Sequence, residues 1–413
     1  MASAEAGHTD LPVDLLEEIL LRLDDVADLA RCSAACSSFH HIIADDRFLR
    51  RFRSLHRTPI LGFLVLNHYH DDKGFSFHPA NPPCRFTPAA RALAGAADFS
   101  FSTVPKPING YDCNICDVRD GRVLLSHHGT TCFTFKYLVV YDPLRRCHVK
   151  IPPIPGDLMP STGLVDWGEK PFLVPAAAGD EKGGNDSPFQ VVMCNVLSID
   201  PDHNFRSFVY SSITGKWRAG APCNIASYEP PGWFFLRRYY AHGSFYWVDC
   251  LGSTNMLVFD MSDMKFSVVD LLPGSEHQNI TIAEVGRDRV GLLILGENTL
   301  DLYSKAEQDI GIVGAKNWRH DHMVRLRGDY QWSFAAAATC GGVAEGYALL
   351  EGYPRDEYKV WKCRPKKKKP PSAHYFTVEL ETLLVEQLCV SEFNVDPAFL
   401  YASFPPPFAP PRI

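Results

Sequence analysis

A strand–turn–strand pattern that recurs from residue 139 to residue 388 constrains the fold more than any other feature. An apolar strand ends in an aromatic residue or Val, a polar residue and a turn follow, and a second strand begins. Five segments share this pattern: VVYDPLRRCHVKI, FVYSSITGKWRAG, LVFDMSDMKFSVV, DLYSKAEQDIGIV and FTVELETLLVEQL. Aligned on Tyr141, Tyr210, Phe259, Tyr303 and Val378, they are separated by 69, 49, 44 and 75 residues. The two spacings near 45 match the usual period of a propeller blade, which is about 40–50 residues.

The two longer spacings fit a blade plus an insertion, at 175–188 and at 364–371. Short runs rich in β-branched and aromatic residues, bounded by turn residues, predict strands throughout this region. They lie at 60–66, 121–126, 137–142, 189–197, 205–211, 243–249, 255–261, 290–295, 300–304, 346–351 and 375–380. Five hairpin units and a sixth from residues 60–104 predict an all-β propeller of about six blades over 56–404. A two-sheet sandwich is the alternative, which the regular spacing disfavours.

The first 55 residues have a different, helical pattern. A helical stripe in the first segment is formed by Leu15, Leu16, Ile19, Leu20 and Leu23. Three further short helical stripes follow before residue 55. Four short helices bury little surface, and the first is apolar over a wide arc, which favours a hydrophobic docking face. The alternative is that these helices cap the large domain. The fold class is therefore α+β multidomain, small N-terminal helices before a propeller.

The stretch LPVDLLEEILLRL…DLARCSAACSSFHHIIADDRFLRRF resembles an F-box over residues 9–52. The resemblance implies docking on the SKP-family linker of a cullin-RING ubiquitin ligase. The contacts that it implies are Leu11, Pro12, Leu15, Leu16, Ile19, Leu20, Leu23, Leu29 and Phe39. Asp24 stands where the family usually has Pro, and Phe39 where many members have Trp. Both replacements keep a helix break or apolar bulk, so we expect docking with altered strength.

The turns YDPLRRCHVKIPPIP and SSITGKWRAG resemble those of F-box-associated, kelch-like propellers of plants. The aromatic- and Arg-rich stretches at 227–240 and 328–334 are candidates for target binding, because such residues anchor interfaces. The candidates are Trp233, Phe234, Arg237, Arg238, Tyr330 and Trp332. The alternative is that these side chains pack between blades.

Composition limits the other possibilities. The net charge of −7 argues against a general nucleic-acid binder. The sequence has no run of 18 apolar residues, so we expect no membrane span. Its start lacks the pattern of a secretory signal. We therefore expect a cytoplasmic or nuclear protein, whose 13 cysteines are mostly small buried residues. The Pro-rich 405–413 segment is expected to be a disordered tail.

Motifs for chemistry are sparse. Cys113 and Cys116 have CxxC spacing, but a second pair at zinc-site distance is missing, so two strand residues are favoured over a metal site. The run Lys366–Lys369 is interpreted as a solvated loop, with a nuclear signal as the alternative. Phosphate-loop, dinucleotide, nucleophile-elbow and His-Glu-x-x-His motifs are all missing. We expect no catalytic residue, metal or cofactor.

These observations favour a non-catalytic substrate receptor of an SCF-type ubiquitin ligase. Its expected partners are the SKP-family linker, through it the cullin and RING subunits, and a protein target of unknown identity. Two alternatives stay open. One is a propeller enzyme or sugar-binding protein with N-terminal capping helices, and the other is a scaffold that binds the linker without directing degradation.

Overall fold

The computed structural model describes residues 11–23, 26–67, 74–104, 113–128, 135–158, 170–174, 188–196, 204–224, 236–249, 254–275, 279–286, 288–310, 318–335, 343–344, 346–363, 371–391 and 398–404. These residues form two compact units. The first holds the described residues up to Thr58 together with Phe404, and the second holds the described part of Pro59–Ser403. Asp24, Lys366–Lys369 and the Pro-rich segment lie outside the described residues.

The first unit is built from four short helices. They are α1 (Val13–Leu20), α2 (Val26–Ala35), α3 (Ser37–Ile43) and α4 (Asp46–Leu55). Their core is a small cluster around Phe52, which is fully buried and stacks on His56 with ring centres 4.1 Å apart. The other buried members are Leu20, Leu21, Leu29, Ile43, Phe48, Leu49 and Phe404. A core of this size agrees with the prediction that these helices bury little surface.

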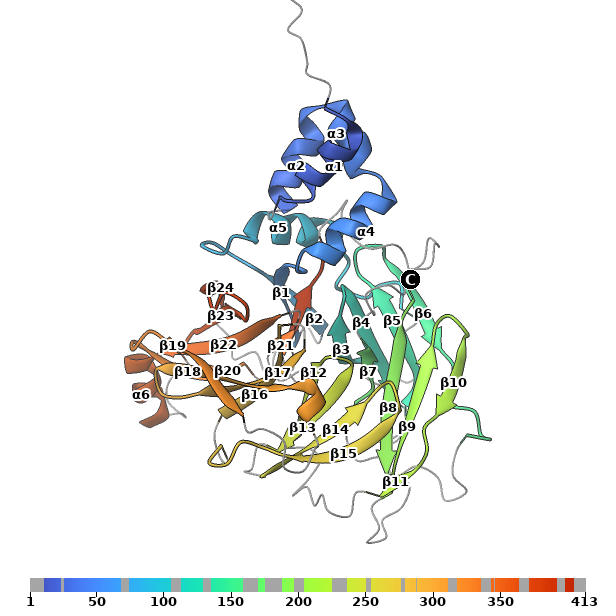
Figure 1. The fold of residues 1–413 in the computed structure, drawn as a ribbon, viewed down its shortest axis with the longest axis vertical. Helices are drawn as coiled ribbons and strands as arrows, with labels where there is room; N and C mark the ends of the chain where they lie inside the picture. Colours follow the sequence, from blue (N-terminus) through green and yellow to red (C-terminus); the bar gives the residue numbers. More distant parts are fainter. Residues whose placement is uncertain are drawn as a thin grey trace, which may run out of the picture. The chain divides into compact units, whose positions relative to one another are not determined.

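The second unit consists of six antiparallel sheets, which confirms the six-bladed β-propeller and shows that the sandwich alternative is wrong (Figure 1). We number the blades in chain order. Blade 1 contains β25 (Ala398–Ala402), β1 (Ile60–Asn67) and β2 (Gly74–Pro79), and blade 2 contains β3 (Cys113–Arg119), β4 (Arg122–His128), β5 (Phe135–Asp142) and β6 (Cys147–Ile151). Blade 3 contains β7 (Phe172–Val174), β8 (Gln190–Val196), β9 (Asn204–Ser211), β10 (Lys216–Ala219) and β11 (Cys223–Asn224).

Blades 4 to 6 follow the same antiparallel plan. Blade 4 contains β12 (Leu236–Ala241), β13 (Ser244–Asp249), β14 (Asn255–Asp260) and β15 (Lys265–Asp270), and blade 5 contains β16 (Asn279–Val285), β17 (Arg289–Leu295), β18 (Thr299–Ala306) and β19 (Arg319–Arg325). Blade 6 contains β20 (Tyr330–Phe334), β21 (Val343–Ala344), β22 (Tyr347–Pro354), β23 (Ala373–Glu379) and β24 (Val385–Ser391).

The propeller closes by pairing the two ends of its chain. Strand β25 pairs with β1 in blade 1, with Phe63 opposite Leu400 and Leu64 opposite Phe399. The register shifts between Ile60 and Gly62, and Gly62 has a φ of 153° that other residues rarely adopt. Pairing of this kind joins the two ends of the propeller within one blade.

Packing between blades explains why the strand sequences are almost continuously apolar. In β14, Leu257 and Phe259 pack against blade 3, whereas Met256 and Val258 pack against blade 5. Alternate side chains point to opposite faces of a strand, so a sheet covered on both faces needs apolar residues at every position. The middle strands of each blade therefore read as apolar runs rather than as alternating patterns.

The recurring turn of the sequence has a common backbone geometry. Four of the five aligned segments place a residue with positive φ five positions after the aligned residue: Arg146, Gly215, Met264 and Leu383. Only one of these is glycine, so the signal was in the spacing rather than in a residue type. The fifth segment differs, because residues Glu307–Asp309 form a short 3-10 helix after β18.

Two helices of the second unit were not predicted from the sequence. They are α5 (Thr87–Ala96), which contacts β1 and β2, and α6 (Arg355–Cys363), which contacts β20 and β22. In α5 the side chains of Ala90 and Leu93 are buried. Half of the residues of α5 are Ala, so the apolar stripe that would identify a helix is weak.

Candidate docking surfaces

Some apolar side chains in and next to helix α1 are exposed, and others are buried. Leu15 and Ile19 are 51% and 52% exposed, and as i and i+4 they lie next to each other on one face. Leu11 and Val13 are also exposed, whereas Leu20 and Leu21 are buried in the helical core. Exposed large apolar side chains grouped on one short helix are typical of a binding surface. Val13 is two positions from Leu15 and so lies on another side of the helix, and we call Leu15 and Ile19 the α1 face.

Only part of the predicted linker-binding set belongs to this surface. Leu11, Pro12, Leu15 and Ile19 are exposed, and Leu16, Leu23 and Phe39 are half-buried. The prediction is wrong for Leu20 and Leu29 as surface residues, because they are 3% and 0% exposed and form the core of the four helices. Val13, which the prediction did not include, is also exposed.

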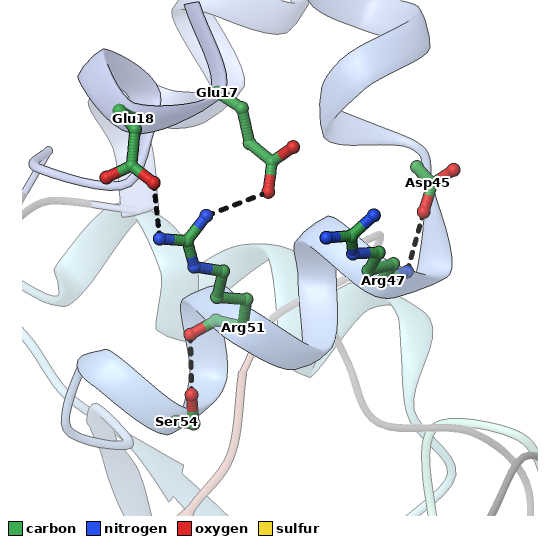
Figure 2. A network of polar contacts seen from close by, with 6 residues as sticks. All are labelled: Glu17, Glu18, Asp45, Arg47, Arg51 and Ser54. Atoms are coloured by element: carbon green, nitrogen blue, oxygen red, sulfur yellow. Dashed lines mark hydrogen bonds and ion pairs between the residues drawn. The ribbon is translucent and has the colours of Figure 1, made fainter. Parts of the chain in front are cut away.

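Ion pairs hold α1 against α4 (Figure 2). The Arg51 guanidinium donates from Nη1 to Glu17 Oε1 at 3.1 Å and from Nη2 to Glu18 Oε1. Hydrogen bonds from Arg51 to Glu18 and then to Glu17 raise the pKa of Arg51 above its usual value. The polar side of α1 is therefore fixed to α4, and the α1 face is presented on a positioned helix.

Side-chain caps begin helices α3 and α4. The Asp45 carboxylate accepts from the Arg47 backbone N–H at 2.7 Å at the start of α4, a normal N-cap (Figure 2). The Cys36 Sγ accepts from the Phe39 N–H at 3.4 Å at the start of α3. Phe39 then packs against the helical core rather than standing free. The position at which many F-box sequences have Trp is therefore occupied here by a Phe side chain that contributes to the core of the helices.

Of the six predicted target-binding residues, two lie outside the described residues, one is half-buried and three are buried. Trp233 and Phe234 lie outside the described residues. Arg237 is half-buried on β12, and its Nη1 donates to Asn279 Oδ1 at 3.5 Å. Arg238 is 2% exposed, so its prediction as a surface residue is wrong. It packs over the Phe172 ring at 4.0 Å, and its Nη1 donates to the Lys170 carbonyl at 3.2 Å.

Tyr330 and Trp332 are also packing residues, which contradicts their prediction as target contacts. Both are buried on β20. The Trp332 Nε1 donates to the Arg327 carbonyl at 2.8 Å, and its ring meets Phe376 edge-on at 4.9 Å. Tyr330 OH lies 3.1 Å from His374 Nδ1. Sequence alone could not separate these roles, since aromatic residues serve both interfaces and blade packing.

The CxxC pair lies on strand β3, in agreement with the interpretation as two strand residues. Cys116 is fully buried, and this burial raises the pKa of its thiol to about 11. Across the described ranges, no three His, Cys, Asp or Glu side chains are grouped so as to hold a metal ion.

Comparison with known proteins agrees with the N-terminal assignment. Residues 8–55 match the F-box-like family model. No curated protein matches the chain. One similar solved structure is an oligogalacturonate lyase in complex with manganese, with 9% identity and a TM-score of 0.34 over 65% of this chain and 62% of that one. At this level the likeness carries no argument about function. None of the described helices is long and apolar enough to cross a membrane. The chain carries an F-box-like domain at its N-terminus, followed by a six-bladed β-propeller.

Proposed function

We propose that the chain is the substrate receptor of an SCF-type cullin-RING ubiquitin ligase and performs no chemistry itself. The observation that carries this proposal is the α1 face, a pair of exposed apolar side chains inside a segment that matches the F-box-like model. An F-box-like domain suggests an adaptor role. In this proposal the α1 face binds the SKP-family linker, and the linker brings the cullin and RING subunits.

The mechanism is proximity. The propeller holds a target protein while the ligase brings a charged ubiquitin-conjugating enzyme to the same assembly. A target lysine then meets the thioester at a high effective concentration. The similarity to F-box-associated, kelch-like propellers of plants is part of this proposal. The expected cytoplasmic or nuclear location follows from the same assignment.

The proposal is tested by reconstitution. Ile19→Asp and Leu15→Asp place a charge on the α1 face without removing a core side chain, because both residues are about half exposed. Each variant should lose co-purification with the linker and lose ubiquitination of proteins that co-purify with the wild-type chain. Leu384→Asp makes the same change at an exposed position of the propeller and should leave both unchanged.

Three results would separate the alternatives. Linker binding without ubiquitination of any co-purified protein would favour the scaffold. Normal linker binding by both α1 variants would show that the docking assignment is wrong. Turnover of a substrate by the chain in the absence of the linker would favour a propeller enzyme.

A further inference from the structure

A pocket of about 400 Å³ opens between blades 3 and 4. Blade 3 contributes the β9–β10 turn and the residues just before β8. Blade 4 contributes the β12–β13 and β14–β15 turns. Glu307, which follows β18 in blade 5, completes the lining. The pocket is within the size range of small-ligand and side-chain binding sites, and turns from three blades meet in it.

The lining offers an apolar surface for an extended side chain. Phe189 is buried, and Tyr240 and Met261 are half-buried. Tyr240 is held in place because its hydroxyl accepts from the Gly243 N–H at 3.1 Å and its ring packs on Phe245 at 5.0 Å. Ile213, from the β9–β10 turn, is 71% exposed. An apolar side chain this exposed, beside a pocket, is suited to contact a partner.

The charges of the lining are arranged unevenly. Asp260 and Glu307 both lie near Tyr246: burial raises the pKa of this tyrosine, and the two carboxylates add to the effect. Asp260 Oδ1 accepts from the Ser262 N–H and hydroxyl, both at 2.7 Å. Within the described chain, the Glu307 carboxylate has no hydrogen-bonded or ion-pair partner. Arg218 supplies a single positive side chain from blade 3.

His242 also lies in the lining and contacts blade 5. Its Nε2 lies 2.9 Å from the Arg289 carbonyl, so that nitrogen is the donor, and its Nδ1 lies 3.6 Å from Glu284. Both of its ring nitrogens thus contact blade 5. Among the side chains of the lining, two carboxylates therefore face one guanidinium; Arg119 and Arg122, outside the lining, lie over the rings of Tyr240 and Phe189.

Building on the adaptor function, we propose that this pocket is the target-recognition site and binds one Lys or Arg side chain of the target with an apolar residue beside it. The alkyl stem of the basic side chain would lie on Tyr240 and Met261, as long cationic side chains do on apolar surfaces. Its cationic group would reach Asp260 and Glu307, and charge-assisted hydrogen bonds of this kind are strong. Ile213 would contact the apolar neighbour.

Arg218 supplies specificity in this arrangement. A second cation next to the first would meet a like charge on the blade 3 side, which is unfavourable. The pocket therefore favours a single basic residue over a basic run. An acidic or phosphorylated segment would reverse these roles, since it would need Arg218 and would be repelled by Asp260 and Glu307.

The test uses a phage-displayed library of random peptides selected on the full-length chain. We expect enriched sequences to carry one Lys or Arg next to an apolar residue. A synthetic copy of the most enriched peptide should bind the Asp260→Asn/Glu307→Gln variant at least tenfold more weakly, by fluorescence anisotropy. Asn keeps the Oδ1 acceptor for Ser262, so the turn is preserved. Arg218→Ala should bind the same peptide at least as tightly as the wild type.

Several outcomes would overturn the proposal. They are no enrichment over the bare surface, unchanged affinity of the double variant, and enrichment of acidic peptides that Arg218→Ala fails to bind. The SKP-family linker should bind all variants as it binds the wild type. If the wild-type chain binds the peptide but not the linker, the adaptor function fails while the pocket assignment stands.

Discussion

The pair of Asp117 and Arg238 links the innermost strands of three successive blades, and its removal should destabilise the propeller. Asp117 is on β3 and fully buried, Arg238 is on β12, and Arg238 Nη2 lies 3.7 Å from Asp117 Oδ2. The Asp117 carboxylate also accepts from the Leu173 N–H on β7 at 2.9 Å. One buried carboxylate on blade 2 thus accepts a hydrogen bond from blade 3 and forms an ion pair with blade 4.

Arg238→Met removes the guanidinium that lies over the Phe172 ring and leaves an apolar side chain at this position. Two charges at this distance attract each other by about 4 kcal/mol at an effective dielectric constant of about 20. Removing one partner of a buried pair usually costs about 3–5 kcal/mol, because the other charge stays buried. We therefore expect Arg238→Met to lower the free energy of unfolding of the propeller by about 3 kcal/mol.

The assay is equilibrium urea unfolding of the full chain, followed by tryptophan fluorescence. Arg237→Met is the matched control, since Arg237 is adjacent on β12 but only half-buried, and it should cost less than about 1 kcal/mol. The double variant Asp117→Asn/Arg238→Met should cost less than the sum of the single changes, because it leaves no buried lone charge. A cost for Arg238→Met equal to that of Arg237→Met would refute the reasoning.

Three further predictions concern stability. Phe52→Ala should cost about 3–5 kcal/mol in the first unit, where Phe52 is fully buried, and should abolish linker binding while the propeller still unfolds cooperatively in a thermal scan. Gly62→Ala should destabilise the propeller by about 1–3 kcal/mol, because a Cβ would overlap the His78 carbonyl at a positive φ, whereas Gly95→Ala in helix α5 should not reduce stability in the same urea titration. Asp98→Asn should flatten the loss of stability in acid. Burial raises the pKa of Asp98, but hydrogen bonds from Ser100, Ser102 and Tyr141 outweigh it and hold the pKa below the usual value, so this stabilisation is present above about pH 4 and is lost as the pH falls further. Equal acid sensitivity of wild type and Asp98→Asn would contradict the last prediction.

The architecture could be predicted from the sequence because the blades repeat the same local pattern of strands and turns. Covered on both faces, the middle strands must be apolar throughout, and the turn after the third strand recurs at fixed spacing, as in residues 141–146 and 259–264. Blade 1 was harder to complete. Its strand β25 comes from the end of the chain, and nothing local in residues 398–402 shows that they pair with residues 60–65.

The sites were predicted less well, for a physical reason. Helical spacing places Leu15 and Leu20 on one helix, but only the packing of α2 to α4 decides which of them is covered. Arg238 and Trp332 illustrate the same limit in the propeller, because a stretch rich in Arg and aromatic residues describes a tight blade contact as well as an interface. The pocket between blades 3 and 4 has no sequence signature, since its walls come from turns of three blades.

The affinity of the full chain for an SKP-family linker, measured by titration calorimetry, tests the central claim most directly. Full burial of a Leu or Ile side chain contributes about 1.5–3 kcal/mol, so two half-exposed side chains should contribute about 2 kcal/mol together. We predict that Leu15→Ala/Ile19→Ala binds the linker about 30-fold more weakly than the wild type. Leu384→Ala, an exposed leucine of the propeller, should bind with unchanged affinity. Equal affinities of the wild type and the α1 double variant would contradict the assignment of the α1 face as the docking surface.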